Sequence, residues 1–453
     1  MEPRTIRFPK DFLWGSAISA HQTEGDNRLN DWWAWEEAGR VKERSGLACD
    51  HYQRFEEDIA LAQRLNHRVF RFSIEWSRIE PKEGEWNEEA LRHYRKVLES
   101  LRSRQIEPVV TLHHFTNPLW LVKKGGWDSP FVCEAFQRFA RKAMESYGDL
   151  VTYWVTLNEP LVYVYQGYIA GIWPPGEHSF EKALSVIRHQ IIAHAMAYRA
   201  LHDGAASRKW PSPKVGIAKN LIIFTPCAGR SAYDRFSTWL RHTFFNQFFL
   251  RALRTGHLIY PGLFFERQPL IKGTLDFIGL NYYTRDFVHF GGFRIPGPFG
   301  EVCTLPHHAR VGPRNELGWE IYPQGLYISL KELARLGLPI LVTENGTCTR
   351  QDGERWSFIT SHLAQVWRAI QEGVQVFGYL YWSLLDNFEW ADGFGPRFGL
   401  VEVDYPSMAR RIRESGERYA EVCASGEVPL DLQSATIGSI PQKKGSRRSD
   451  HGT

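Results

Sequence analysis

The stretch that decides the fold runs from residue 68 to residue 158. It contains three short runs, RVFRFSI (Arg68–Ile74), PVVTLH (Pro108–His113) and TYWVTLN (Thr152–Asn158), separated by amphipathic segments at residues 88–104 and 131–147. The short runs are mostly apolar on both faces, which is typical of parallel strands covered on both sides. Strands that alternate with helical segments indicate a parallel sheet with helical crossovers.

The same alternation extends over most of the chain. Further strand-like runs occupy residues 12–19, 215–220, 276–283, 339–345 and 376–384, and further helical patterns occupy residues 51–65, 180–202, 233–254, 325–336, 354–372 and 409–423. Eight strands alternating with eight helices predict an α/β fold, a single (β/α)8 TIM barrel. A doubly wound open sheet is the competing architecture, but Trp14-Gly15-Ser16 after the first strand is not the glycine-rich turn it needs.

We expect one domain, the barrel, over residues 1–430. Residues 431–453 form a polar and basic tail with almost no apolar side chains, which predicts disorder. Glycine and proline gather in residues 290–314, after the sixth strand, and predict a long loop. On a barrel this loop lies on the face that carries the active site.

Composition excludes several classes of protein. The 453 residues are 43% hydrophobic and 14% aromatic, with 17 Trp, which is ample material for a large core. A formal net charge of +4 is too balanced to imply a nucleic-acid partner. No apolar run approaches the ~18 residues of a membrane span, and no signal peptide is visible, so we expect a cytoplasmic protein without a membrane partner. Nothing in the sequence indicates the oligomeric state.

The six cysteines are widely scattered and have no Cys or His partner at the spacing of a zinc site. Reduced thiols are therefore expected, and no metal.

The carboxyl ends of barrel strands are where catalytic side chains are expected. Glu159 and Glu344 both stand there, each beside an asparagine. Either glutamate alone could be a helix cap or part of a buried ion pair, but together they fit the acid and the nucleophile of glycosidic bond cleavage. Arg71, on a neighbouring strand, is the cation available to keep one carboxylate ionised, although a lone strand arginine can also be purely structural.

Six motifs occur in order along the chain. They are FLWGSAISAHQTEG (Phe12–Gly25), FRFSIEWSRI (Phe70–Ile79), TLNEP (Thr156–Pro160), GLNYY (Gly279–Tyr283), VTENG (Val342–Gly346) and YWSLLDNFEWADGF (Tyr381–Phe394). With these motifs the sequence resembles glycoside hydrolase family 1, the β-glucosidase family, over nearly all of residues 6–425. The resemblance implies a (β/α)8 barrel and a retaining double displacement without a cofactor.

The resemblance also implies a role for each matching residue. Glu159 would be the acid/base and Glu344 the nucleophile. Arg71 and Tyr283 would hold Glu344, with Asn281 as support. The other matches would bind substrate: Asn158 at the sugar 2-hydroxyl, Gln22, His114, Glu389 and Trp390 at the other glycone hydroxyls, Trp382 as the floor of the sugar subsite, and Trp319 against the aglycone.

Three positions bear on the substrate. Phe115 stands where the family usually has Trp, so an indole donor to the glycone is missing. Glu159, in place of the Gln of plant thioglucosidases, implies O-glycosides. Glu389 would repel a sugar phosphate.

We therefore expect an exo-acting β-glucosidase for small-molecule, non-phosphorylated β-glycosides, with activity on β-galactosides and β-fucosides as well. A transglycosidase using the same site is one alternative. A non-catalytic sugar-binding protein of the same fold is another, which the presence of both glutamates disfavours.

Overall fold

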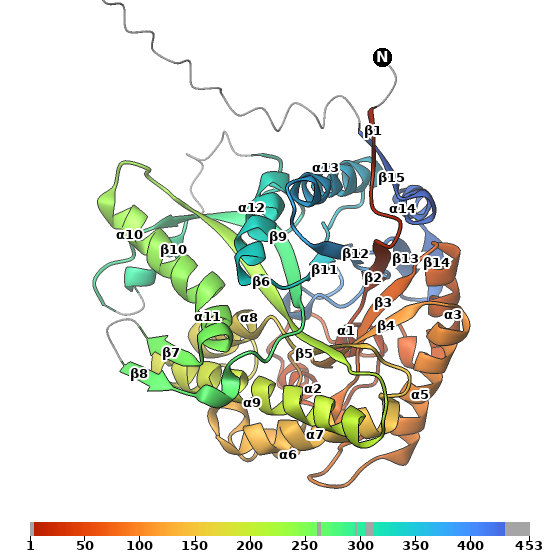
Figure 1. The fold of residues 1–453 in the computed structure, drawn as a ribbon, viewed down its shortest axis with the longest axis horizontal. Coiled ribbons are helices and arrows are strands. Elements are labelled where there is room, and N and C mark those ends of the chain that lie inside the picture. The colour runs from red at the N-terminus through yellow and green to blue at the C-terminus, as the bar shows by residue number, and fades with distance from the viewer. Residues whose placement is uncertain (1–3, 261–263, 295–296, 304–311, 431–453) are drawn as a thin grey trace, which may run out of the picture.

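A computed structural model describes residues 4–260, 264–294, 297–303 and 312–430 (Figure 1). The predicted tail, residues 431–453, and part of the predicted loop at residues 290–314 lie outside the described residues. Among the described residues, none of the helices combines the length and the apolar character that crossing a membrane requires.

Eight parallel strands close into a barrel, as predicted. In ring order they are β2 (Leu13–Ala17), β3 (Val69–Ser73), β4 (Glu107–His113), β5 (Tyr153–Asn158), β6 (Lys214–Pro226), β9 (Ile278–His289), β11 (Ile340–Asn345) and β12 (Val376–Trp382). The pairing of β12 with β2 and of β6 with β9 leaves no open edge in the ring. The open-sheet alternative is therefore wrong.

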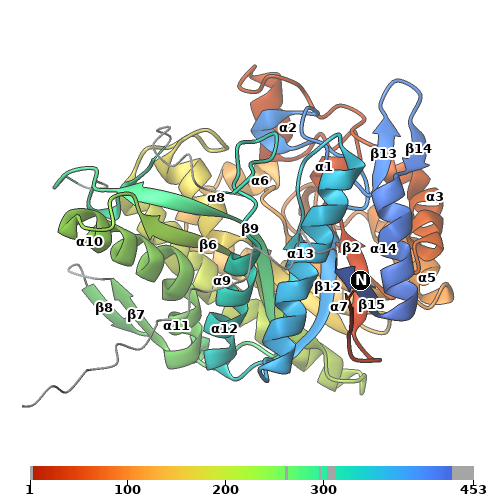
Figure 2. The same ribbon diagram turned by 90° about the horizontal axis from the view of Figure 1, so that it is seen from above.

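Helices surround this ring, as Figures 1 and 2 show. The longer ones are α3 (His51–Arg64), α5 (Glu88–Ser103), α7 (Phe131–Tyr147), α9 (Phe180–Ser207), α10 (Ala232–Arg241), α11 (Phe248–Thr255), α12 (Pro323–Leu333), α13 (Asp352–Gln371) and α14 (Glu414–Ser425). Short helices follow several strands: α1 (Ala20–Thr23), α2 (Asp31–Glu37), α4 (Trp76–Ile79), α6 (Leu119–Val122) and α8 (Pro160–Val164).

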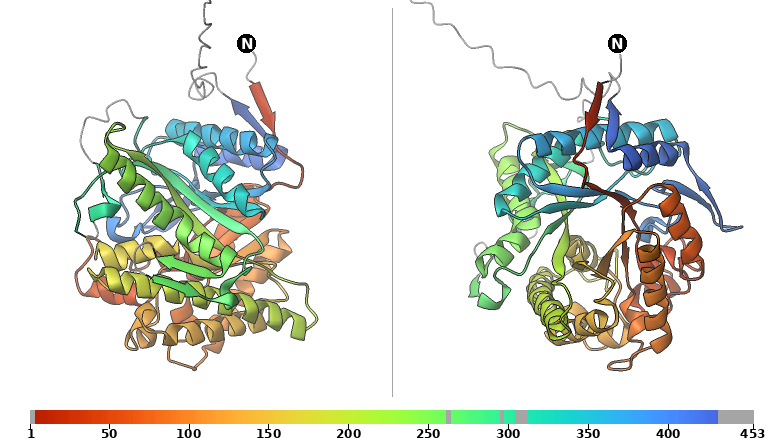
Figure 3. Two further views of the ribbon diagram at one scale, coloured as in Figure 1. Left: turned by 60° about the vertical axis from the view of Figure 1, so that its left-hand side comes forward. Right: turned by 45° about the vertical axis from the view of Figure 1, so that its right-hand side comes forward.

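The remaining strands lie outside the ring. β1 (Arg4–Arg7) pairs with β15 (Glu427–Leu430), which brings the two ends of the described chain together at one edge of the molecule (Figure 3). β7 (His257–Tyr260) pairs with β8 (Phe264–Arg267), and the two-residue strand β10 (Glu301–Val302) pairs with the end of β9.

Two helix predictions need correction. The predicted helix at residues 233–254 is two helices, joined by a π-helix at His242–Gln247. The predicted helix at residues 409–423 begins only at Glu414, because Ala409–Ile412 forms strand β14, paired with β13 (Val401–Asp404). The alternation of a strand explains this: Arg410 turns to the buried Asp58, and the next residue, Arg411, binds Glu402.

The barrel interior is filled by small and medium apolar side chains from successive strands, among them Ala17, Val69, Val109, Val155, Ala218, Leu341 and Leu380. Because side chains alternate along a strand, Arg71 lies on the same face as Val69, one layer nearer the carboxyl end. Register shifts before Asn158 in β5 and before Glu344 in β11 interrupt this alternation. Bulges of this kind re-aim side chains beside active sites.

Candidate active site

Glu344, near the end of β11, is held by two donors. The guanidinium of Arg71 donates from Nη1 to one carboxylate oxygen of Glu344, and the Tyr283 hydroxyl donates to the other at 2.6 Å. The Glu344 carboxylate is 5% exposed and the Arg71 side chain 1% exposed. A buried carboxylate with a cation on one oxygen and a hydroxyl donor on the other is stabilised in its ionised form.

Arg71 is fixed by partners on neighbouring strands. Its Nε donates to Thr111 Oγ1 at 3.0 Å, and its Nη2 donates to Asn158 Oδ1 at 2.7 Å. The planar guanidinium therefore joins β3, β4, β5 and β11 at one layer of the barrel. This network orients the Glu344 carboxylate as well as balancing its charge.

Glu159 follows β5 and occupies the N-cap position of α8, without a side-chain cap hydrogen bond. Its φ of 42° lies in the left-handed region that residues other than glycine rarely adopt, and such backbone outliers gather at functional sites. One carboxylate oxygen accepts from Asn281 Nδ2 at 2.9 Å and from Asn220 Nδ2 at 3.0 Å. Burial, reinforced by the negative charge of Glu344, raises the pKa of Glu159 to about 7 despite these donors.

The two glutamates line one cavity of about 360 Å³, together with every other predicted site residue except Arg71 and Asn281. Those two lie behind the cavity wall and bind the glutamates directly. Six barrel strands, β3, β4, β5, β9, β11 and β12, thus carry most of the predicted residues, within the strand or directly after it.

The inner end of this cavity, as defined here, consists of Gln22, His114, Trp382, Glu389 and Trp390. Gln22, in α1, accepts from Ser19 Oγ at 2.6 Å and donates to the carbonyl of Phe388 at 2.9 Å, so its amide has a fixed orientation. Asn158 Nδ2 lies 3.2 Å from His114 Nε2. Burial, then the charges of Asp392 and the two catalytic candidates, raise the pKa of Glu389 to about 8.

The outer wall, as defined here, consists of Tyr165, Ile172, Phe224, Asp286, Val302 and Trp319. Phe224 and Asp286 lie on the parts of β6 and β9 that extend past the barrel, and Val302 is in β10. Trp319 packs against Tyr283, with ring centroids 5.4 Å apart. The position of Trp319 beside Tyr283 fits the predicted contact with an aglycone.

Sequence reasoning missed two polar residues near Glu159. Asn220 is the last residue of the predicted strand at residues 215–220, and its strand-end position was the available signal. Lys219 is buried, its Nζ donates to the carbonyl of Asn220, and burial lowers its pKa to about 7. The positive form of Lys219 lowers the pKa of Glu159.

Two carboxyl groups in different electrostatic states, inside a cavity lined by aromatic and polar side chains at the carboxyl ends of barrel strands, define a glycosidase. Comparison with known proteins gives the family. The model of Glycosyl hydrolase family 1 matches residues 4–428, so the chain belongs to that family. The predicted family, the barrel and the class of enzyme, a glycosyl hydrolase, are confirmed.

Relatives cover almost the whole chain. A 1,4-beta-D-glucan glucohydrolase of Thermotoga neapolitana is 34% identical over 92% of this chain and 98% of the relative. A beta-galactosidase of Pyrococcus woesei is 32% identical over 94% of this chain and 99% of the relative. These hydrolase names give no support to a non-catalytic sugar-binding protein.

Solved structures agree with this placement. A beta-glycosidase from Pyrococcus horikoshii matches with a TM-score of 0.88 and 40% identity, covering 97% of this chain and 99% of that one. A beta-glucosidase from Thermotoga maritima in complex with deoxynojirimycin matches with a TM-score of 0.84 and 32% identity, covering 94% of this chain and 100% of that one.

Proposed function

We propose that this enzyme hydrolyses terminal, non-phosphorylated β-glycosides with retention of configuration, with Glu344 as the nucleophile and Glu159 as the acid/base. The observation that carries the proposal is the opposite environment of the two glutamates. Arg71 and Tyr283 stabilise the ionised form of Glu344. Burial and the nearby negative charge favour the protonated form of Glu159, with a pKa of about 7.

In the first half-reaction, an ionised oxygen of Glu344 attacks the anomeric carbon while the bond from that carbon to the aglycone oxygen breaks. Glu159 donates its proton to the departing oxygen. A covalent glycosyl-enzyme forms, and Glu159 is left ionised.

In the second half-reaction, Glu159 takes a proton from water as the water oxygen attacks the anomeric carbon. The bond to Glu344 breaks, Glu344 regains its negative charge, and Glu159 regains its proton. Two inversions at one carbon give net retention. Asn158, held by Arg71 and close to His114, is placed to donate to the sugar 2-hydroxyl during both steps.

The inner end of the cavity supports a neutral glycone. Glu389 can accept protons from two sugar hydroxyls when it is ionised, and the negative charges of ionised Glu389 and Glu344 would repel an anionic phosphate. The named activities of the relatives, β-glucosidase and β-galactosidase, support glucose and galactose as glycones. Activity on β-fucosides and a cytoplasmic location stay predictions.

Azide rescue tests the nucleophile. Glu344→Ala should lose at least about 10⁴-fold in kcat on an aryl β-glucoside, because no covalent intermediate can form. Azide should restore turnover by occupying the space of the lost carboxylate, and the product should be the α-glycosyl azide. Failure of rescue in a folded variant, or a β-glycosyl azide as product, would contradict the assignment of Glu344.

Leaving-group dependence tests the acid. Glu159→Gln should slow glycosides with poor leaving groups far more than activated aryl glycosides, because only the former need a proton. The matched control is Glu389→Gln, which changes a carboxyl group of the same cavity without removing the proposed acid. Equal losses on both kinds of substrate in Glu159→Gln would contradict the acid role.

Product analysis at high concentrations of an acceptor sugar separates hydrolysis from transglycosylation. We expect free glycone to remain the main product there. Transfer products that dominate under these conditions would favour the transglycosidase alternative.

A further inference from the structure

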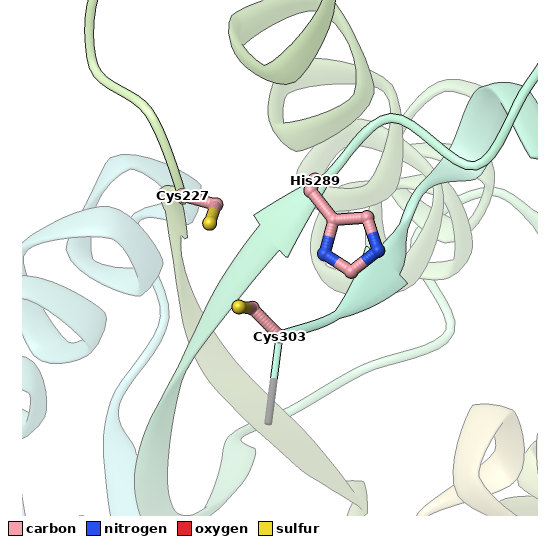
Figure 4. Close-up of side chains that lie close together, drawn as sticks. All are labelled: Cys227, His289 and Cys303. Atoms are coloured by element: carbon pink, nitrogen blue, oxygen red, sulfur yellow. The ribbon is translucent and has the colours of Figure 1, made fainter. Parts of the chain in front are cut away.

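A cluster of potential metal ligands lies on the wall formed by the ends of β6, β9 and β10. The sulfurs of Cys227 and Cys303 and a ring nitrogen of His289 all lie within 4.8 Å of one another. In Figure 4 the two sulfurs and the ring nitrogen nearer the main chain point into the same space. The three residues are far apart in the sequence, so their spacing does not match a known zinc-binding pattern.

The strand register explains how Cys227 meets His289. Pro226 at the end of β6 pairs in parallel with Val288 of β9. The residues that follow this pair, Cys227 and His289, are therefore neighbours, and their side chains leave the same face of the two strands.

The register also places Cys303 on this face. Val302 of β10 pairs with Val288 in an antiparallel register, so Cys303 lies opposite Phe287. Phe287 and His289 are two residues apart on β9 and share a face. The backbone pairing thus agrees with the side-chain positions.

The backbone positions do not suit a disulfide. The amide of Cys227 donates to the carbonyl of Val288 at 2.8 Å, and the amide of Cys303 donates to the carbonyl of Phe287 at 2.7 Å. Successive carbonyls of a strand point to opposite edges, so the two cysteines flank β9 with their backbones about 9.5 Å apart, two strand spacings. A disulfide needs Cα atoms roughly 4.4–6.8 Å apart.

A single tetrahedral ion suits the spacing of the two sulfur atoms. With Zn–S bonds of about 2.3 Å, two thiolate ligands of one zinc ion lie roughly 3.8 Å apart. This spacing falls within the limit observed for the three ligand atoms. Two thiols and an imidazole also bind zinc in preference to harder cations such as Mg²⁺ and Ca²⁺, which favour oxygen ligands.

We propose that Cys227, His289 and Cys303 bind one Zn²⁺ ion, with water in the fourth position. Each thiol loses its proton to solvent as its sulfur–zinc bond forms, and no oxidation or reduction occurs. Glu301 Oε2 lies 3.6 Å from His289 Nε2. A carboxylate on the far nitrogen of a metal-bound histidine is the usual partner that orients the ring.

The ion would act on structure rather than on the hydrolytic step. Its ligands come from the ends of three chain segments, and β10 consists of only two residues. Val302, directly before Cys303, lines the outer wall of the cavity. A zinc ion would therefore tie β10 to the ends of β6 and β9 and hold this part of the wall in place.

Cobalt titration of the full-length protein tests the proposal without reference to activity. The protein is reduced, freed of metal with a chelator and titrated with Co²⁺, followed by competition with Zn²⁺. We expect one equivalent of Co²⁺ to give near-ultraviolet thiolate-to-cobalt bands with the visible bands of a tetrahedral ion, and Zn²⁺ to displace them.

Variants assign the ligands. Cys227→Ala, Cys303→Ala and His289→Ala should each weaken Zn²⁺ binding at least about 100-fold, and Glu301→Gln about 10-fold. Cys133→Ala, which removes a buried thiol from α7, should bind as the unchanged protein does. Circular dichroism and hydrolysis of a small aryl glycoside check that each variant is folded.

Three results would overturn the proposal. One is the absence of thiolate-to-cobalt bands at one equivalent in the unchanged protein. Another is unchanged binding in folded Cys227→Ala and Cys303→Ala. The third is a disulfide between Cys227 and Cys303, found by peptide mapping of protein kept from reductant.

Discussion

The inner end and the outer wall of the cavity are built in different ways. The inner end comes from residues at or just past the ends of barrel strands, and four of its five members are buried, with Glu389 partly exposed. The outer wall comes from extensions and short elements outside the barrel, and Tyr165, Ile172 and Val302 are 42%, 51% and 38% exposed. The inner end is largely buried and carries three polar side chains, whereas the outer wall is more exposed and mostly apolar. The cavity therefore has one region suited to a fixed sugar and one suited to varied aglycones.

This difference has an energetic meaning. A polar site that hydrogen-bonds a substrate hydroxyl rejects analogues strongly, because a missing hydroxyl leaves a buried group unpaired. An apolar wall discriminates weakly, since its contacts are non-directional. Substitutions at the inner end should therefore lower kcat/KM equally for all substrates. Substitutions in the outer wall should lower kcat/KM only for substrates with large aglycones.

Among substitutions that test this difference between the two ends of the cavity, Glu389 should give the largest effect. Glu389→Ala removes hydrogen bonds to two sugar hydroxyls, each worth about 0.5–1.5 kcal/mol, or about 1.5–3 kcal/mol where the carboxyl is ionised. We expect kcat/KM to fall about 10²–10³-fold, to the same extent for aryl and alkyl β-glucosides. Steady-state kinetics on such a pair measures it. A loss confined to one aglycone would break the division between the two ends.

Trp319 should give a smaller and selective effect. Trp319→Ala removes an aromatic face, and aromatic contacts are worth about 0.5–1.5 kcal/mol beyond the area they bury. We expect kcat/KM to fall about 10-fold on an aryl β-glucoside and to change little on methyl β-glucoside. Binding of a monosaccharide-sized inhibitor should be unchanged. If that binding weakened as much as aryl glycoside hydrolysis, Trp319 would belong to the inner end.

The inner end could be predicted because barrel geometry constrains it. Strand ends meet at one face, so Glu159 and Glu344 could be expected to converge from apolar runs and the residues beside them. The bulges before Asn158 and Glu344, which set the final directions of these side chains, leave no pattern in one sequence. The geometry of the network therefore had to come from the structure.

The outer wall could not be predicted for a related reason. The strands predicted at residues 215–220 and 276–283 end near the barrel rim, whereas β6 and β9 continue to Pro226 and His289. Past the rim most side chains of these strands are only partly buried, so the continuous apolar pattern that marks a barrel strand is lost. Cys227, His289 and Cys303 come together only because of this extension, so their proximity could not be predicted from the sequence either.

Asn220, a cavity-lining residue of β6, should affect the pH profile. Its amide donates to Glu159 and thereby lowers the pKa of that carboxyl, so Asn220→Ala should raise the pKa. Activity needs Glu159 protonated and therefore falls as the pH rises past about 7. In the variant this fall should move to higher pH, by up to about 1 unit.

The pH dependence of kcat/KM on a substrate with a poor leaving group measures the shift. Glu389, whose pKa is raised to about 8, also titrates in this range, but the Asn220 amide donates to Glu159. Glu389→Gln therefore serves as the control, and Asn220→Ala in that background should show the same shift. A profile that moved to lower pH would contradict the role given to Asn220.

The smallest effect should come from substitution of a proposed zinc ligand. It tests most directly whether the inner end and the outer wall of the cavity are independent. Cys303→Ala should raise KM for a β-glucoside with a long aglycone by a few-fold, because Val302 next to it would no longer be held against the cavity. A methyl β-glucoside should show unchanged kcat and KM, since Cys303 is not among the described residues that line the cavity. Chelator treatment of the unchanged protein should reproduce this pattern, and Cys133→Ala should not. An equal loss on both substrates would mean that the outer wall and the inner end are mechanically coupled, so the cavity would behave as one unit rather than two.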